Sequence, residues 1–143
     1  MEVGGQLVCE TIDKISSGKI EGTAQEGKAT KAPKIFKKDC KINWSDSIEN
    51  IHDFIRGLSP YPTAWTFVDE EQKQNIKVFK SSIQKTSHSE SSGKIITDGK
   101  NELKVAVNGG FIQLDEIQLS GKKKMKTEDF LRGYRFAEDI ILK

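Results

Sequence analysis

Lysine is the residue type in this sequence whose pattern best supports a chemical role. One group of lysines occupies residues 121–126, directly after the last predicted strand, where a rigid scaffold would present several cations on a short loop. A second group of lysines lies upstream, in residues 34–41, and two arginines, Arg132 and Arg135, follow residues 121–126. Cations from separate segments that converge in space neutralise the phosphates of a folded nucleic acid and give a salt-dependent contact that reads no bases. We therefore predict a set of RNA-binding side chains, with an ordinary solvated surface as the alternative: Lys34, Lys37, Lys38, Lys41, Lys122, Lys123, Lys124, Arg132 and Arg135.

The sequence contains no group of residues that predicts catalysis or a metal site. His52 and His88 have no second histidine or cysteine at the spacing of metal ligands. The carboxylate pairs Glu70-Glu71 and Asp115-Glu116 fall on predicted turns or bulges, with nothing nearby to raise a pKa. The sequence also lacks a nucleophile elbow and a phosphate-binding glycine loop. We predict structural roles for both histidines, no catalytic residue and no metal ligand.

Length and composition set the broad class of the protein. The chain has 143 residues and carries 23 basic and 21 acidic side chains, so its net charge of +2 identifies no partner. The basic residues nevertheless gather in 27–41, 77–100 and 120–143. No apolar run approaches the roughly 20 residues of a membrane span, and the N-terminus lacks a signal-peptide pattern. Because Cys9 and Cys40 suit a reducing compartment, we predict a cytoplasmic protein with no membrane partner. We also expect it to be a monomer.

Helical spacing predicts two helices ahead of a β region. The first spans residues 3–16 and ends at Gly18. Residues 19–41 follow, rich in Gly, Ala, Thr and Lys with little periodicity, and indicate an interdomain linker more strongly than an edge strand. A second helix, capped by Ser45, has its apolar face on Ile48, Ile51, Ile55 and Leu58.

Alternating apolar residues then predict five strands, over 64–68, 75–83, 93–97, 102–107 and 111–119. Asp98-Gly99 and Asn108-Gly109 are typical of tight hairpins. Ile117 is out of phase with the apolar residues before it, which predicts a bulge near Asp115-Glu116. A short helix, capped by Thr127, follows residues 121–126, which form the lysine loop. Five short strands with one apolar face each favour a small closed barrel over a sandwich.

The aromatic residues do not alternate with the lysines along the chain. Phe79, Phe111 and Phe130 lie in apolar patterns and are predicted to be core residues, which favours backbone contact with a shaped RNA over stacking on unpaired bases. Trp44, Tyr61 and Trp65 are predicted to lie apart from the basic surface. They either pack locally or form a docking face for another domain.

Two motifs resemble the C-terminal domain of the methionyl-tRNA formyltransferase family. They are residues 55–66 (IRGLSPYPTAWT) and residues 121–125 (GKKKM) followed by 130–133 (FLRG). Residues 32–35 (APKI) and 42–45 (INWS) are similar to the linker and the start of that domain. Other formyltransferases, acting on sugar nucleotides or folate, share the proline-aromatic segment, whereas the lysine loop with the FLRG run favours the tRNA enzyme.

The resemblance implies an enzyme that transfers a formyl group from formyl-tetrahydrofolate to the amino group of methionine on initiator methionyl-tRNA. It implies that an N-terminal catalytic domain performs this chemistry, so that no catalytic residue and no cofactor site is carried over to this chain. Residues 1–18 would be the final helix of that missing domain, residues 19–41 the interdomain linker, and residues 42–143 the C-terminal domain.

The fold class implied for residues 42–143 is mainly β with flanking helices, a small five- to six-stranded OB-like barrel that holds the tRNA through its backbone. Arg56, Tyr61 and Trp65 would then pack against the catalytic domain. The alternative is a structural C-terminal domain of a sugar-nucleotide or other folate-dependent formyltransferase, which would not bind RNA.

Overall fold

The structure, a computed structural model, describes residues 2–19, 21–69, 74–137 and 139–143. The chain divides into two compact units, Met1–Pro33 and Lys34–Lys143. Among the described residues, no helix has the length and apolar character needed to cross a membrane. The assignment of residues 1–18, 19–41 and 42–143 to the last helix of a catalytic domain, an interdomain linker and a C-terminal domain remains a prediction.

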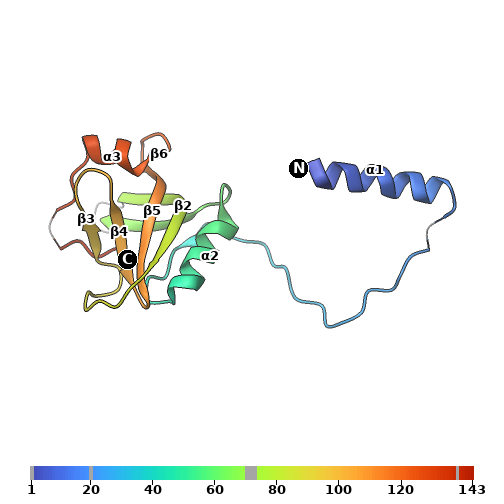
Figure 1. The fold of residues 1–143 in the computed structure, drawn as a ribbon, viewed down its shortest axis with the longest axis horizontal. Helices are drawn as coiled ribbons and strands as arrows, with labels where there is room; N and C mark the ends of the chain where they lie inside the picture. Colours follow the sequence, from blue (N-terminus) through green and yellow to red (C-terminus); the bar gives the residue numbers. More distant parts are fainter. Residues whose placement is uncertain (1, 20, 70–73, 138) are drawn as a thin grey trace. The chain divides into compact units, whose positions relative to one another are not determined.

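The described residues of the first unit form α1 (Glu2–Ser16) and, over residues 21–33, a segment without regular structure (Figure 1). The predicted end of this helix is confirmed, because Gly18 has a φ of +66° and the N–H of Lys19 donates to the carbonyl of Lys14 at 3.1 Å. Within the described residues, the apolar side chains of the helix are more than half exposed: Val3, Leu7, Val8, Ile12 and Ile15.

The second unit is mainly β. It begins with the short 3-10 helix η1 (Lys37–Cys40) and α2 (Ile48–Leu58), and it ends with α3 (Thr127–Gly133). Between the two α-helices lie β1 (Ala64–Asp69), β2 (Gln74–Lys85), β3 (Ile95–Thr97), β4 (Leu103–Val107), β5 (Gly110–Leu119) and β6 (Met125–Lys126). All strand pairs are antiparallel, in the order β1-β2-β5-β4-β3, with β6 paired to β5 (Figure 1). The predicted mainly β class with flanking helices is confirmed.

The register of β1, β2 and β5 separates an inner face from an outer face. Directly opposed residues of an antiparallel ladder point to the same side. Trp65 of β1 opposes Lys77 of β2, which in turn opposes Gln118 of β5, and these three form a row on the outer face. The residues that alternate with this row are buried in the core: Ala64, Thr66, Ile76, Val78, Ile117 and Leu119.

Two bulges, one on each strand, lie on either side of the Lys80–Glu116 pair in the long β2–β5 ladder. The register shifts at Phe79 on β2 and again at Asp115 on β5. As a result, Leu114 and Ile117 are both buried although they are three positions apart. The bulge predicted from the change of phase in the sequence is confirmed.

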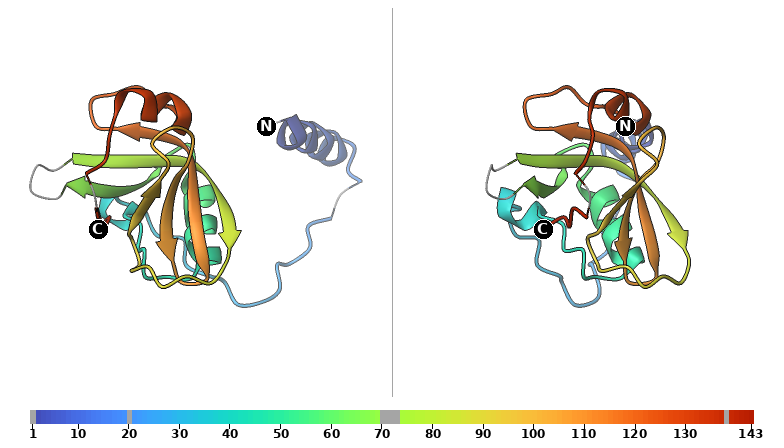
Figure 2. Two further views of the ribbon diagram at one scale, coloured as in Figure 1. Left: turned by 60° about the vertical axis from the view of Figure 1, so that its left-hand side comes forward. Right: turned by 90° about the vertical axis from the view of Figure 1, so that its left-hand side faces the viewer.

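Helix α2 packs against β2 and β5 (Figure 2). Its predicted apolar face is confirmed as buried: Ile48, Ile51, Ile55 and Leu58. The predicted cap at Ser45 is wrong, because the hydroxyl of Ser47 accepts the N–H of Asn50 at 3.3 Å and caps the helix. The N–H of Ser45 donates to the side chain of Asn43 at 3.2 Å. Because Ser45 takes part in this local turn, the helix is capped two residues later than predicted.

The predicted cap of the last helix is also wrong. Thr127 is buried, and its hydroxyl donates to the carbonyl of Leu114 on β5. Lys126 occupies the capping position of α3 without a side-chain hydrogen bond. The threonine therefore ties α3 to the sheet instead of capping the helix.

The strand ladder itself is not closed, in contrast to the predicted closed barrel. Among the described residues, β1 and β3 are the two ends of the strand path and do not pair with each other. The C-terminal segment runs back from α3 and bridges them (Figure 2). Leu142 donates its N–H to Gly93 at 2.9 Å beside β3, and the carbonyl of Lys143 accepts the N–H of Phe67 on β1 at 3.0 Å. The arrangement is compatible with an OB-like fold.

A buried hydrogen-bond chain fixes this closure from the inside. The indole N–H of Trp44 donates to the hydroxyl of Thr66 at 2.9 Å, and that hydroxyl donates to the carbonyl of Lys143 at 3.0 Å. Trp44 and Thr66 are both buried, so each polar atom needs such a partner. Trp44 is thus a core residue that packs locally, one of the two roles considered for it.

The two predicted hairpins differ in length. Asn108-Gly109 forms a two-residue connection, since Val107 of β4 pairs directly with Gly110 of β5. The connection at Asp98-Gly99 is longer, because Thr97 pairs with Leu103. The carboxylate of Asp98 organises it by accepting the backbone N–H groups of Lys100, Asn101 and Glu102, each at 2.8 Å.

Gly93 provides a test of the closure by the C-terminal segment. It has a φ of +86°, and a Cβ at this position would lie 2.7 Å from the carbonyl oxygen of Leu142. We expect Gly93→Ala to lower the free energy of unfolding by more than about 1 kcal/mol, measured by urea denaturation. The control is Gly57→Ala in α2, where a Cβ meets nothing within 4 Å and should stabilise the helix by roughly 0.5–1 kcal/mol. Equal effects of the two substitutions would contradict this role of Gly93.

Asp98 makes stability depend on pH in the acid range. Backbone N–H groups, that of Glu102 most strongly, lower the pKa of Asp98 from 3.8 to about 2. Because the pKa is lower in the folded protein, the stabilisation is present above about pH 4 and is lost as the pH falls towards 2. We expect Asp98→Asn to remove this part of the fall in melting temperature, with Asp13→Asn in α1 as the control. Parallel curves of melting temperature against pH for Asp98→Asn and the parent chain would disprove the assignment.

Candidate nucleic-acid interface

Residues 34–41 lie against the outer side of β1. The indole N–H of Trp65 donates to the carbonyl of Lys37 at 2.8 Å, and Lys41 forms a parallel bridge with the same tryptophan. The N–H of Ile42 donates to the carbonyl of Trp65, also at 2.8 Å. These contacts explain why residues 34–41 belong to the compact unit, although their composition resembles that of the linker residues before them.

Cys40 anchors the same segment in the core. Its side chain is buried, and its thiol donates to the carbonyl of Phe36 at 3.4 Å. Burial raises the pKa of the Cys40 thiol, and the nearby charge of Asp39 raises it further. Cys40 is therefore a protonated packing residue that holds η1 in place, not a reactive thiolate.

A polar cavity of about 280 Å³, the lysine cavity, lies where the 34–41 segment meets the outer face of the sheet and the base of the lysine loop. Two ammonium groups, two side-chain amides and a hydroxyl are among the groups that line it, with no carboxylate among its lining residues. The residues are Lys37, Asn75, Lys77, Gln118, Leu119, Ser120 and Gly121. The structure thus brings together two segments that the sequence analysis could only assume to converge.

Lys77 is a member of this cavity that the sequence analysis missed. It is exposed on β2 between the buried residues Ile76 and Val78. The signals available in the sequence were its outward phase in an alternating strand and its place at the start of the basic stretch 77–100. Neither signal distinguishes it from an ordinary solvated lysine.

The lysine loop is held at its base and near its end. The amide of Gln118 donates to the carbonyl of Lys122 at 2.9 Å, while Lys122 and Lys123 are exposed. Lys124 forms an ion pair with Glu116 at 3.1 Å. Because this pair is largely exposed, it restrains the loop without removing the cation from solvent.

Four of the predicted lysines lie over aromatic rings. The ammonium nitrogens of Lys34, Lys37, Lys41 and Lys124 lie 5.2–5.8 Å from the ring centroids of Phe36, Trp65, Phe67 and Phe79, respectively. The prediction that Trp65 lies apart from the basic surface is therefore wrong, as are the core assignments of Phe79 and Phe111, which are only partly buried. Apart from Phe36, these rings are distant along the chain from the lysines that cover them, yet the two kinds of side chain lie together in the fold. Phe130 is a core residue as predicted.

Of the nine predicted cations, Lys37 lines this cavity, and the other eight are not among its lining residues. Lys38 is exposed on η1. Arg132 pairs with Asp129 at 3.2 Å on the surface of α3. Arg135 donates to the carbonyls of Gly99, at 2.9 Å, and Leu131. The described contacts do not bring either arginine to the lysine cavity.

The three residues predicted to contact another domain have different surroundings. Arg56 forms an exposed ion pair with Asp53 at 3.0 Å, one turn earlier in α2. Tyr61 is 88% exposed between two prolines. Trp65 packs edge-on against Phe67, with 5.0 Å between ring centroids, and binds Lys37 within its own unit.

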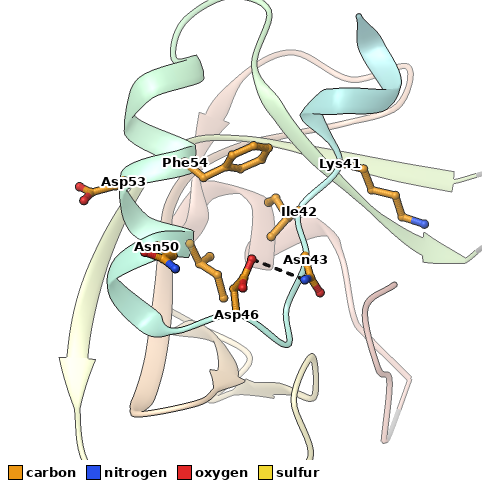
Figure 3. Close-up of a pocket in the computed structure, with 8 residues that line it drawn as sticks. Lys41, Ile42, Asn43, Asp46, Asn50, Asp53 and Phe54 are labelled. Carbon is orange, nitrogen blue, oxygen red and sulfur yellow. Dashed lines mark hydrogen bonds between the residues drawn. The ribbon is translucent and has the colours of Figure 1, made fainter. Parts of the chain in front are cut away.

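A second cavity, of about 340 Å³, lies between residues 41–46 and α2 (Figure 3). Its lining contains two carboxylates, and the amide of Asn43 donates to Asp46 at 3.5 Å. Figure 3 shows the ammonium of Lys41 pointing away from the other lining side chains. The charge of this cavity makes it unsuited to a polyanion.

Both histidines have structural partners, as predicted. His52 bonds to the hydroxyl of Ser81 at 3.0 Å. His88 stacks on Phe111, and its Nε2 lies 2.9 Å from the carbonyls of Val107 and Gly110, which holds the serine-rich residues 87–92 against the β4–β5 hairpin. The part of the chain that the structure describes contains no cluster of three potential metal ligands.

Of the two carboxylate pairs considered for catalysis, Asp115-Glu116 lies among the described residues, and both of its members have structural partners. Asp115 accepts the hydroxyl of Ser82 at 3.3 Å, and Glu116 is paired with Lys124. The pair at 70–71 lies outside the described residues.

Comparisons with known proteins agree with this architecture. A family model described as "Formyl transferase, C-terminal domain" matches residues 34–135. The methionyl-tRNA formyltransferase of Bacteroides fragilis is 43% identical over 100% of this chain and 46% of its own length. Those of Phocaeicola vulgatus and Flavobacterium johnsoniae are 44% and 39% identical over 97% of this chain and 45% of their own lengths. The chain spans about half the length of these curated relatives.

A solved structure supports the fold. The crystal structure of a HypX variant from Aquifex aeolicus superposes with a TM-score of 0.63, covering 92% of this chain and 24% of that chain. Sequence identity is 14%, so this likeness concerns the fold alone.

The lysine loop should be dispensable for folding. We expect replacement of Lys122, Lys123 and Lys124 by Ala to change the free energy of unfolding by no more than about 0.5 kcal/mol per residue, because all three are exposed. Leu119→Ala, at the buried base of the loop, is the contrasting control and should cost roughly 2–5 kcal/mol. Urea denaturation measures both. A loss for the triple lysine variant as large as that for Leu119→Ala would make the loop structural.

Proposed function

This chain belongs to the formyl transferase C-terminal domain family, and on that premise we propose that it is the tRNA-binding part of a methionyl-tRNA formyltransferase. The parent enzyme would formylate initiator methionyl-tRNA in the cytoplasm, with formyl-tetrahydrofolate as the formyl donor. In this proposal an N-terminal catalytic domain binds the folate and performs the transfer. The present chain contributes affinity for the RNA and no reacting group.

The observation that carries the proposal is the convergence of lysines around the 280 Å³ cavity. Lys37 comes from the segment before α2, Lys77 from β2, and Gly121 begins the lysine loop. Two cations held on separate segments of one compact unit, with the start of the lysine loop beside them, suit a polyanion whose phosphates recur along a backbone. The amides of Asn75 and Gln118 add donors that can complete the binding of a phosphate oxygen.

The same geometry favours contact with the RNA backbone. Lysine presents a compact charge on a flexible stem, which neutralises phosphates without the paired hydrogen bonds that identify a base edge. The exposed Lys122 and Lys123 extend the basic surface beyond the cavity. Lys34, Lys38, Lys41 and Lys124 belong to the same proposed surface, whereas Arg132 and Arg135 are expected to contribute less.

A salt titration of binding to initiator methionyl-tRNA tests the proposal. We expect log K to fall linearly with log salt concentration, and Lys77→Ala to weaken binding and reduce the slope by about one unit at most. Lys100→Ala, an exposed lysine of the β3–β4 connection, is the matched control and should leave the slope unchanged. Filter binding or fluorescence anisotropy measures these affinities.

Two results would contradict the proposal. One is the absence of binding at low salt, even in the weak range typical of non-specific contact, roughly 10⁻⁴ to 10⁻⁶ M. The other is an equal effect of Lys77→Ala and Lys100→Ala, which would mean that overall charge alone governs the affinity. The first result would favour a structural C-terminal domain of another folate-dependent formyltransferase, whereas the second would overturn the cavity as the site of RNA binding.

A further inference from the structure

The outer face of β1 and β2 carries a row of aromatic rings beside the lysine cavity. Trp65 and Phe67 are on β1, and Phe79 is at the bulge of β2. All three side chains are only partly buried. Lys77 opposes Trp65 directly, and Asn75 opposes Phe67, so rings, a cation and an amide alternate over neighbouring positions of one surface.

Each of the three rings is covered by a lysine ammonium. Lys37 lies 5.8 Å from the ring of Trp65, Lys41 lies 5.2 Å from Phe67, and Lys124 lies 5.3 Å from Phe79. Such contacts are weak at exposed sites, whereas a lysine–phosphate contact joins two full charges. An arriving phosphate can therefore draw an ammonium away from a ring and uncover its face.

A nucleotide offers the complementary pair of groups, a flat base and an adjacent phosphate. A basic groove with aromatic side chains on which bases stack is the arrangement by which proteins hold unpaired nucleic acid. The charge of the surface excludes a cationic partner, and a wholly paired RNA would leave the rings unused. The strand faces of OB-like folds are a common place for such contacts.

We propose that unpaired nucleotides of the bound RNA stack on Trp65 and Phe67, with the flanking phosphates on Lys37 and Lys77. This inference rests on the proposed function, because it concerns the same RNA-binding surface. It adds a second class of contact, with unpaired bases as well as backbone, and so reverses the expectation from sequence that stacking is absent. Trp65 also keeps its hydrogen bond to Lys37, so the stacking surface and the cation are positioned together.

Tryptophan fluorescence of the 143-residue chain tests the inference. Trp44 is 4% exposed and its indole is bonded to Thr66, so quenching by added RNA should report Trp65. The probes are an unstructured oligouridylate of about eight nucleotides and a blunt-ended RNA duplex of matched charge. We expect the single strand to quench the emission, and Trp65→Phe to abolish that quenching.

The affinity of the Phe67→Leu variant for RNA is a second test, because this substitution keeps apolar bulk and leaves the hydrogen bond between Trp65 and Lys37 in place. We expect it to weaken oligouridylate binding by roughly ten-fold, as loss of one stacking ring typically does, and to leave duplex binding nearly unchanged. Phe111→Leu, the same change at the far end of β5, is the matched control and should alter neither affinity. Melting temperatures establish that each variant is folded.

The outcomes separate this inference from the proposed function. If oligouridylate leaves the emission of Trp65 unchanged, or if Phe67→Leu weakens duplex and single strand equally, the stacking inference is wrong. Continued salt-dependent binding of initiator methionyl-tRNA in that case would leave the proposed function standing. If neither the tRNA nor either probe binds, both proposals fail.

Discussion

The antiparallel register of β1, β2 and β5 is the constraint on which the second unit depends. Because side chains alternate between the two faces of a sheet, a slip of one residue would bury Trp65 and Lys77 and expose Thr66. Thr66 binds both Trp44 and Lys143, so the register that sets the outer face also sets the closure of the fold from inside. The neighbouring bulges of β2 and β5 keep the core continuous where the alternation of buried and exposed residues changes phase. Core, closure and candidate interface are therefore three consequences of one pairing.

Strand β1 joins these features because segments from both sides of it in the sequence cover its open edge. Lys41 and Ile42 pair with Trp65, and Lys143 pairs with Phe67. Covering an edge strand removes a template for pairing with other chains. Here the covering segment also carries lysines, so the same contacts that protect the edge place Lys37 beside the sheet and form the cavity. The basic surface thus depends on the segment that covers the edge of β1 as well as on the number of lysines in the sequence.

Local signals in the sequence predicted most of the secondary structure, and their failures have a common cause. The spacing of Ile48, Ile51, Ile55 and Leu58 identified α2, and the change of phase at Ile117 identified the bulge. Ser45 and Ser47 have equal capping chemistry, and only the bond from the Ser45 backbone to Asn43 decides between them. Thr127 has a capping side chain too, but the carbonyl of Leu114 lies close enough to bind it instead. Where a side chain has two possible partners, the choice depends on neighbours that are distant in the sequence.

The sequence by itself determined the kind of fold, the groups of lysines and the resemblance to a formyltransferase domain, because spacing and residue type are properties of the chain. It did not determine which cations meet or that aromatic rings lie among them. Lys37 and Trp65 are 28 residues apart, and Lys77 is marked by nothing except its outward phase. Only the tertiary structure decided these neighbours, since the register of β1, β2 and β5 places segments that are remote in the chain on one face.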